Sequence, residues 1–371
     1  MNIVVFGLTI TSSWGNGHAT LWRGLCRALG AAGHEVTFFE RDLPYYAQHR
    51  DPFHAPGFQL LIYPEWAAVA PVVRRVLARA DAAIVTSYCP DASPASDEVL
   101  RFCRGVRAFY DLDTPVTLER ISVGDPPAYL PRCGLGAFDI VLSFGGGPAL
   151  DALGARLGAK AVAPLYGSVD PRVHHPAPPQ ARYRSALTHL GTYSPDRRDK
   201  LEELFVRVAR HRPDLPFIAC GPLYPDDFPS VPNVWRLSHA APDEHAALFS
   251  SAALSLNLTR RSMVQWGWCP SGRLFEAAAC GTPQVSDAWE GLQAFFEPGE
   301  EIFVARSAAD VLETLSLPRG ERERVARRAR ERVLDEHTSE RRAQELVASL
   351  EGIDGGRTYR PARVGAGPSE A

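Results

Sequence analysis

Hydrophobic and polar positions alternate in blocks along the first half of the chain. Leu21, Leu25, Ala28 and Leu29 recur at spacings of four and three, which is typical of an amphipathic helix, and Gly33 is expected to end it. Short apolar runs rich in β-branched and aromatic residues predict buried strands at 2–10, 34–40, 58–64, 81–88, 106–112 and 138–144. Strands that alternate with helices indicate parallel βαβ units, so this half is predicted to be a Rossmann-like layer structure.

The same alternation starts again after a Pro-rich segment, 164–180. Further strands are predicted at 186–193, 216–222, 233–238, 252–258, 281–287 and 301–305. Helices are predicted between them at 195–211, 242–251, 271–281 and 307–315. The second half therefore repeats the α/β architecture of the first, although no literal sequence repeat is visible.

The Pro-rich segment indicates a domain linker. We expect an N-terminal domain at 1–166, a linker at 167–181, a C-terminal domain at 182–350 and a disordered tail at 351–371. Two Rossmann-like domains joined by one linker predict a cleft between them, and such folds bind ligands at the carboxyl ends of their strands.

The charged stretch 321–350 is predicted to be a single helix with a solvated face. An RNA-binding arm is the less favoured alternative, because Glu interrupts each basic cluster.

Composition indicates which binding partners and which cellular compartment are expected. The 371 residues are 45% hydrophobic and 22% charged, with a net charge of −3, which predicts no general attraction to nucleic acid or to an anionic membrane. Seven cysteines without metal-ligand spacing fit free thiols in a reducing compartment. Neither a signal region nor an apolar run of about 20 residues is evident, so we expect a cytoplasmic protein without a membrane span. The excess of Arg over Lys is typical of a GC-rich bacterial genome.

The segment 269–283 places one acid, Glu276, within an apolar helix surface, where an ionised carboxylate is costly unless it has a partner. Ser271 is predicted to be the N-cap, with the helix beginning at Gly272 and ending at Gly281. The helix start and Arg273 suit a phosphate. Glu276 would then lie where it could accept two hydroxyls of a ribose. The equally weighted alternative is a Glu–Arg pair with Arg260 or Arg261.

Two further junctions of the second half carry cations or hydroxyls just after a strand. Arg197 and Lys200 follow its first strand, and Asn257, Thr259 and Arg260 lie at the end of its fourth. Because the carboxyl ends of parallel strands share one edge, these groups and the helix start at 271–273 together predict a pyrophosphate site.

In the first half, Gly15, Asn16 and Gly17 permit a tight loop after the first strand, followed by His18. The spacing is not GxGxxG. Near the end of the next strand the acids are Glu40 and Asp42, neither in the usual context, so a dinucleotide site is weakly supported. His18 is either a catalytic group or merely a helix cap.

Asp111 and Asp113 end another predicted strand. They could orient a hydroxyl or act as a base, or simply form the turn that Asp-Thr-Pro favours. Their spacing also matches metal-binding pairs, but no other ligand is evident from the sequence, so we expect no metal.

The segments 189–198, 256–287 and 295–315 resemble glycosyltransferases of the GT-B fold, of the CgeB-like, group 1 kind. The resemblance implies two Rossmann-like domains that face each other across a cleft. It implies that Glu276 binds the ribose of a sugar nucleotide, and that Arg197, Lys200 and the helix start at 271–273 bind its phosphates. Many retaining relatives carry a second Glu eight positions before the ribose Glu, and here that position is Trp268.

We therefore expect a metal-independent glycosyltransferase without a cofactor, which moves a sugar from a nucleotide diphosphate donor, UDP-linked, to a small-molecule or glycan acceptor. A nucleotide-sugar epimerase or hydrolase on the same fold is an alternative, and so is a non-catalytic sugar-nucleotide-binding protein. An NAD-dependent oxidoreductase is the least favoured, because its fingerprint is missing. The sequence does not specify the oligomeric state.

Overall fold

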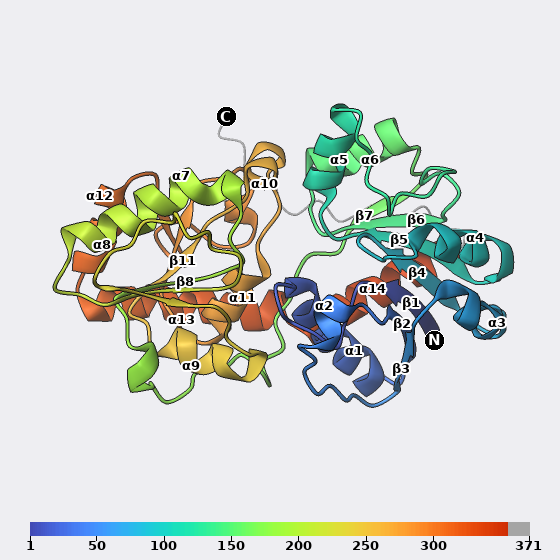
Figure 1. Cartoon of the computed structure of the whole chain (residues 1–371), viewed down its shortest axis with the longest axis horizontal. Helices are drawn as coiled ribbons and strands as arrows, with labels where there is room; N and C mark the ends of the chain where they lie inside the picture. Colours follow the sequence, from blue (N-terminus) through green and yellow to red (C-terminus); the bar gives the residue numbers. More distant parts are fainter. Residues whose placement is uncertain (355–371) are drawn as a thin grey trace, which may run out of the picture. The chain divides into compact units, whose positions relative to one another are not determined.

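The computed structural model describes residues 1–354, and the predicted tail therefore lies mainly outside the described residues. The chain divides into two units (Figure 1). Unit 1 combines Met1–Tyr166 with the segment that starts at Ser339, and unit 2 is Gly167–Thr338. The division differs from the predicted domains, because the end of the chain joins the N-terminal unit.

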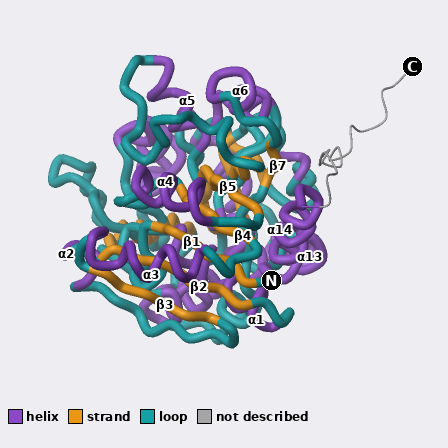
Figure 2. Tube along the Cα trace, turned by 90° about the vertical axis from the view of Figure 1, so that its right-hand side faces the viewer, coloured by secondary structure: helices purple, strands orange, loops and turns teal. Residues whose placement is uncertain are grey.

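Unit 1 is built on a parallel sheet, and its strand order within the described residues is β3-β2-β1-β4-β5-β6-β7 (Figure 2). Its strands are β1 (Asn2–Gly7), β2 (Glu35–Arg41), β3 (Phe58–Tyr63), β4 (Ala82–Thr86), β5 (Val106–Asp111), β6 (Ile140–Ser143) and β7 (Val162–Pro164). The first six confirm the strands predicted for this half, and the three-residue β7 was not predicted.

Successive side chains of each strand pack in different hydrophobic cores, one on each face of the sheet. In β1, Ile3 and Val5 pack on one face, whereas Val4 and Phe6 pack on the other, as the two-residue period of a strand requires. Helices α1 (Gly17–Ala31) and α14 (Ser339–Asp354) contribute to the first core, and α3 (Trp66–Leu77), α4 (Ala92–Phe102) and α6 (Pro148–Leu157) contribute to the second. The remaining helices of this unit within residues 1–354 are α2 (Pro44–Ala47) and α5 (Thr114–Ser122).

The charged stretch predicted as one helix is two helices in the structure. Helix α13 (Arg319–Glu336) ends before His337, and α14 begins at Ser339. Ala343, Leu346 and Leu350 form an apolar stripe on α14, and all three are buried in the core that also contains α1. Burial of this stripe explains why α14 belongs to unit 1, and the helix continues through residues 351–354, which were predicted to be tail.

Unit 2 contains a second parallel sheet, and its strand order within residues 1–354 is β10-β9-β8-β11-β12-β13. Its strands are β8 (Leu187–Leu190), β9 (Phe217–Cys220), β10 (Val234–Leu237), β11 (Ser255–Asn257), β12 (Gln284–Asp287) and β13 (Phe303–Ala305). All six were predicted, and their side chains are mostly buried, as expected for strands covered on both faces.

Helices cover both faces of the second sheet, as the region around β8 and β11 in Figure 1 shows. On one face the chain turns through Pro195–Arg197, α7 (Arg198–Leu201), a π-helical turn at Glu202–Val206 and α8 (Arg207–His211), and α12 (Ala308–Ser316) packs beside them. On the other lie α9 (His245–Ser250), α11 (Gly272–Ala279) and α13. Helix α10 (Arg261–Trp266) and 3-10 turns at Ala181–Tyr183, Pro242–Glu244 and Leu292–Ala294 complete the unit. Within residues 1–354, no helix is long and apolar enough to cross a membrane.

The assignment of α14 to unit 1 can be tested by truncating one buried side chain. Leu346→Ala should lower the free energy of unfolding of unit 1 by about 2–5 kcal/mol, because a fully buried leucine leaves a cavity. Gln344→Ala, at an exposed position of the same helix, is the matched control and should have little effect. Urea unfolding of both variants measures the difference, and equal stabilities would contradict the packing of α14 on α1.

Candidate active site

The helix that carries Glu276 has the predicted ends. Ser271 occupies the N-cap position, although among the described residues its side chain makes no capping hydrogen bond. Gly281 has a φ of 73°, and its N–H donates to the carbonyl of Ala278 (2.8 Å) while the next N–H, of Thr282, donates to Ala277 (3.1 Å). This left-handed glycine closes α11 as predicted, and the missing cap at Ser271 leaves N–H groups at the start of the helix for another acceptor.

Arg273, in the first turn of α11, lies against the end of strand β8. A Cβ atom on Gly191, the residue after β8, would lie 2.8 Å from Nη2 of Arg273, so a side chain there would displace the guanidinium. The Nε of Arg273 is buried and has no hydrogen-bond partner among the described residues. Burial and the charge of Arg197 together lower the pKa of Arg273 to about 10, and Glu276 opposes the shift.

Arg197 brings a second guanidinium to the same edge of the sheet. Its side chain is buried, and its Nη atoms donate to the carbonyls of Thr192 and Leu258, while Nε has no partner within residues 1–354. Burial lowers the pKa of Arg197 as well. Two buried cations with unused donors are expected where an anionic ligand binds, because burying unpaired charge is otherwise costly.

Tyr224 adds a neutral donor that the sequence did not indicate. Its hydroxyl is buried without a hydrogen-bond partner in the described part of the chain. Burial raises the pKa of this hydroxyl to about 12, and the nearby charges of Arg197 and Arg273 oppose the increase. Tyr224 follows strand β9, the neighbour of β8, so its place just after a predicted strand was the one available signal.

Lys200 and Thr259, both predicted at the pyrophosphate site, converge on Asp287 at the end of β12. The Nζ of Lys200 lies 2.5 Å from Oδ2 of Asp287 and also donates to the carbonyl of Thr259 (3.3 Å). The N–H and hydroxyl of Thr259 both donate to Oδ1 of Asp287 at 2.9 Å. The charge of Lys200 is thus compensated by a carboxylate, in contrast to that of Arg273.

Asn257 and Arg260 also have protein partners. The amide nitrogen of Asn257 donates to the hydroxyl of Ser286 (3.0 Å), and its Oδ1 is buried without a partner among the described residues. The Nε of Arg260 lies 3.5 Å from Oδ2 of Asp196. Both side chains therefore border the carboxyl edge of the second sheet, where Arg197 lies.

Glu276 is not paired with Arg260 or Arg261, so within the described residues the alternative assignment of a Glu–Arg pair is wrong. Its Oε1 lies 4.0 Å from Nε2 of His174, and 13% of its side chain is exposed. A carboxylate with this access can receive hydroxyl groups from a ligand.

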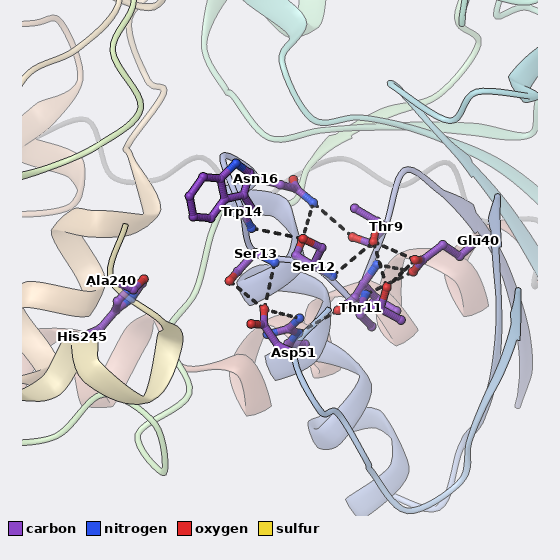
Figure 3. A network of polar contacts seen from close by, with 12 residues as sticks. Thr9, Thr11, Ser12, Ser13, Trp14, Asn16, Glu40, Asp51, Ala240 and His245 are labelled. Carbon is purple, nitrogen blue, oxygen red and sulfur yellow. Dashed lines mark hydrogen bonds and ion pairs between the residues drawn. The ribbon is translucent and has the colours of Figure 1, made fainter. Parts of the chain in front are cut away.

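Two histidines stand beside Glu276. Nε2 of His174 lies 3.4 Å from Nδ1 of His245, whose Nε2 donates to the carbonyl of Ala240 at 3.2 Å (Figure 3). Burial lowers the pKa of His245 to about 4, which Glu276 partly opposes. Among the described residues, His174, His245 and Glu276 are the one group whose ligand atoms could hold a metal ion, all within 4.8 Å of one another. Their separation along the chain concealed this group from the sequence analysis, which predicted no metal.

In unit 1, the loop after β1 is held by the buried acid Glu40 (Figure 3). Its Oε1 accepts from the hydroxyls of Thr9 (2.8 Å) and Thr11 (2.5 Å), and its Oε2 accepts from the N–H groups of Ile10 (2.8 Å) and Thr11 (3.1 Å). Both oxygens are therefore occupied by the loop, and Glu40 cannot receive a ribose as the acid of a dinucleotide site does.

The capping alternative for His18 is wrong, because Asn16 is the N-cap of α1. Oδ1 of Asn16 accepts from the N–H of His18 at 3.2 Å, and its Nδ2 donates to the carbonyls of Thr9 and Ser12, both at 3.2 Å. Gly15 has a φ of 61°, and Gly17 is the first residue of the helix. Asn16 and the glycines thus build the loop, and the imidazole of His18 is left for another role.

His18 and Asp113 meet at Tyr88, a residue that the sequence analysis missed. The hydroxyl of Tyr88 donates to Oδ2 of Asp113 at 2.7 Å, and its ring lies 5.7 Å from that of His18. Strands β1, β4 and β5 are neighbours, which explains why the residues that follow them gather. Burial lowers the pKa of His18, and Asp113 opposes the shift. Tyr88 has a φ of 65°, an uncommon conformation for a non-glycine residue that often marks a functional site.

Asp111 makes the turn contact expected of it, and its other carboxylate oxygen is buried. Its Oδ1 accepts from the N–H of Asp113 at 3.2 Å, as a turn-forming aspartate does, while Oδ2 is buried with no partner of normal geometry among the described residues. Burial raises the pKa of Asp111 to about 6, although the hydroxyl of Thr117 opposes the shift. No third metal ligand joins Asp111 and Asp113 within residues 1–354.

The sequence of residues 197–348 matches the family model described as "Glycosyl transferase-like", which covers less than half of the chain. No curated protein is detectably similar to the chain.

Several solved structures share the fold. A sucrose-phosphate synthase from Thermosynechococcus elongatus has a TM-score of 0.69 at 15% identity, over 96% of this chain and 100% of that chain. HepE of Anabaena, in complex with UDP-glucose, has a TM-score of 0.65 at 14% identity, over 95% of this chain and 100% of that one. These findings confirm the GT-B fold and the resemblance to glycosyltransferases, and the CgeB-like subgroup stays a prediction.

An alpha-glucosyltransferase in complex with UDP and DNA is a third similar structure, with a TM-score of 0.64 at 13% identity, over 95% of this chain and 99% of that chain. Its DNA ligand does not match the expectation that nucleic acid is excluded as a partner. At this identity, the likeness shows the fold alone.

The raised pKa of Asp111 predicts a pH-dependent effect of Asp111→Asn. A carboxyl whose pKa is raised to about 6 in the folded state stabilises the protein below its ordinary pKa of 3.8, and this stabilisation is lost as the pH rises through 6. The variant cannot ionise, so its unfolding free energy relative to wild type should increase by about 2–3 kcal/mol from pH 4 to pH 7. Urea unfolding at both pH values measures this change.

Asp97→Asn, at an exposed position of α4, provides the control and should show a nearly constant difference. A constant difference for Asp111→Asn as well would contradict a carboxyl that is buried and protonated near pH 6.

Proposed function

We propose that the protein is a glycosyltransferase that moves a sugar from a nucleoside diphosphate donor, UDP-linked, to an acceptor hydroxyl. The observation that carries this proposal is the convergence of Arg197, Arg273 and Tyr224 at the carboxyl edge of the second sheet. Each has a buried polar atom without a hydrogen-bond partner among the described residues. The match of residues 197–348 to a glycosyl transferase-like family supports it.

A diphosphate satisfies these groups better than a neutral ligand does. Its oxygens accept from guanidinium N–H groups and from the free N–H groups at the start of α11, where the helix dipole also favours negative charge. The leaving diphosphate gains negative charge as the glycosidic bond breaks, so the same cations would stabilise the transition state. We propose that Arg197 and Arg273 supply this stabilisation, without a metal ion in the chemical step.

Glu276 lies one turn beyond the helix start, and we propose that it accepts two hydroxyls of the ribose. Its partial exposure and the absence of an arginine partner within the described residues leave its carboxylate available. Two of the similar proteins, HepE and the alpha-glucosyltransferase, are seen in complex with UDP-glucose and UDP respectively, which supports uridine as the base. Lys200, Asn257, Thr259 and Arg260 are proposed to border the phosphates, with Ser271 and Gly272 at the helix start.

In unit 1 we propose that His18, Asp111 and Asp113 orient the acceptor hydroxyl and can accept its proton. A hydroxyl nucleophile has to be oriented and can be deprotonated in the transition state, and an imidazole or a carboxylate can do both. Tyr88 would act as a positioning residue, because its hydroxyl bond fixes the Asp113 carboxylate beside the His18 ring.

The diphosphate assignment predicts a difference between two neighbouring arginines. Arg197→Ala should weaken UDP binding by about 1.5–3 kcal/mol, the contribution of a charged hydrogen bond, and should change uridine binding much less. Arg198→Ala is the matched control, because that side chain points to Asp227 and Glu202 in ion pairs. Isothermal titration of both variants with UDP and uridine measures the effect, and equal losses for the two ligands would reject the assignment to phosphate.

The acceptor assignment predicts an effect on turnover without an effect on donor affinity. His18→Ala should lower the rate of single-turnover transfer by at least about tenfold and leave UDP affinity nearly unchanged. The control is His49→Ala, whose ring stacks on Trp14 instead of on Tyr88, and this variant should transfer at nearly the rate of the parent protein. Wild-type transfer in His18→Ala would remove His18 from the mechanism.

Release of the sugar from the donor without any acceptor would instead indicate a hydrolase or an epimerase. Donor binding without turnover for all acceptors tested would indicate a binding protein.

A further inference from the structure

We propose that His174, His245 and Glu276 form a three-ligand site for a divalent zinc-like ion in unit 2. The three residues come from different parts of the fold: the loop after Asp170, the first residue of α9 and the middle of α11. Two imidazoles and one carboxylate are the donor set of many zinc sites that keep one coordination position open. The site is a property of these side chains and does not depend on the proposed transferase activity.

The distances between the donor atoms suit tetrahedral coordination. Two nitrogens bound to zinc at 2.0–2.1 Å lie about 3.3 Å apart in a tetrahedral site, and Nε2 of His174 lies 3.4 Å from Nδ1 of His245. Oε1 of Glu276 is 4.0 Å from the same Nε2, and all three donor atoms lie within 4.8 Å of one another. The carboxylate oxygen of Glu276 is therefore the donor atom that has to move toward the other two when an ion binds.

The surroundings of His245 orient its ring for a metal. Its Nε2 donates to the carbonyl of Ala240 at 3.2 Å (Figure 3), which places the proton on that nitrogen and leaves the lone pair of Nδ1 directed toward the other two ligands. A backbone carbonyl bound to the far nitrogen is the usual outer contact of a metal-binding histidine. His174 is held by a turn in which its N–H donates to the carbonyl of Asp170 at 2.9 Å.

Glu276 belongs both to the metal site and to the proposed ribose site. The competition that follows from this rests on the proposed function. A carboxylate that coordinates an ion through Oε1 cannot also accept two ribose hydroxyls in the same geometry. The ion is therefore expected to compete with the nucleoside part of the donor, and the open coordination position would hold water.

The experiment uses the full chain without a histidine tag and with Cys133→Ser, because Cys133 is an exposed thiol that could bind zinc itself. Titration with Co²⁺ should produce the visible absorption bands of tetrahedral cobalt at one equivalent, and Zn²⁺ should remove them. Glu276→Gln and His245→Ala should each weaken Co²⁺ binding at least about tenfold, as expected for the loss of a ligand. His175→Ala, an exposed neighbour of His174, is the control and should bind like the parent protein.

Absence of tetrahedral bands in the parent protein would overturn the proposal. So would unchanged Co²⁺ affinity in Glu276→Gln, a variant of nearly the same shape whose folding is checked by its melting temperature without metal. Loss of binding in His175→Ala to the same extent would also contradict the assignment.

The competition is tested with uridine, which has the ribose but no diphosphate to chelate zinc. Saturating Zn²⁺ should weaken uridine binding at least about tenfold in the parent protein and not in His245→Ala. Uridine affinity that is unaffected by zinc would overturn the competition. Failure of uridine and UDP to bind even without metal would overturn the proposed function and leave the cobalt result standing, so the two failures are distinguishable.

Discussion

Buried positive charge at the carboxyl edge of the second sheet is the constraint on which the arrangement of unit 2 depends. Arg197 and Arg273 form no ion pair among the described residues, although burial lowers the pKa of both. The fold accommodates them through local adjustments: Gly191 leaves room for one guanidinium, and the backbone carbonyls of Thr192 and Leu258 accept from the other. A protein that needed only stability would neutralise or replace such groups. Their presence agrees with the proposed binding of an anionic donor.

The charged side chains at the carboxyl edges of the two sheets differ. In unit 1 the carboxyl edge gathers acids and hydroxyls, and Glu40 is completely engaged in holding the loop after β1. Asp111 is buried so deeply that its pKa rises to about 6, whereas Asp113 is oriented by Tyr88. A basic edge suits a phosphorylated donor and an acidic, hydroxyl-rich edge suits a sugar-like acceptor, which agrees with the proposed division of labour.

The sheets could be predicted from the sequence because parallel strands covered on both faces appear as continuous apolar runs. The cap at Ser271 and the stop at Gly281 were also predictable, since both depend on local backbone chemistry. Helix α14 was misassigned because its many charges obscure the stripe formed by Ala343, Leu346 and Leu350. Tyr88 and Tyr224 lie in loops, where no hydrophobic periodicity indicates which way a side chain points. The residues beside Glu276 are distant from it in sequence. Tertiary contacts of this kind leave little local signal, and for Tyr224 that signal was only its place after a predicted strand.

The return of α14 to unit 1 has a consequence for how the protein is made. A chain emerges from the ribosome from its N-terminus, and domains commonly fold in that order. Leu346 and Leu350 belong to the core of unit 1, but they leave the ribosome only after all of unit 2 has done so. The core of the unit that begins the sequence can thus be completed only after unit 2 has emerged.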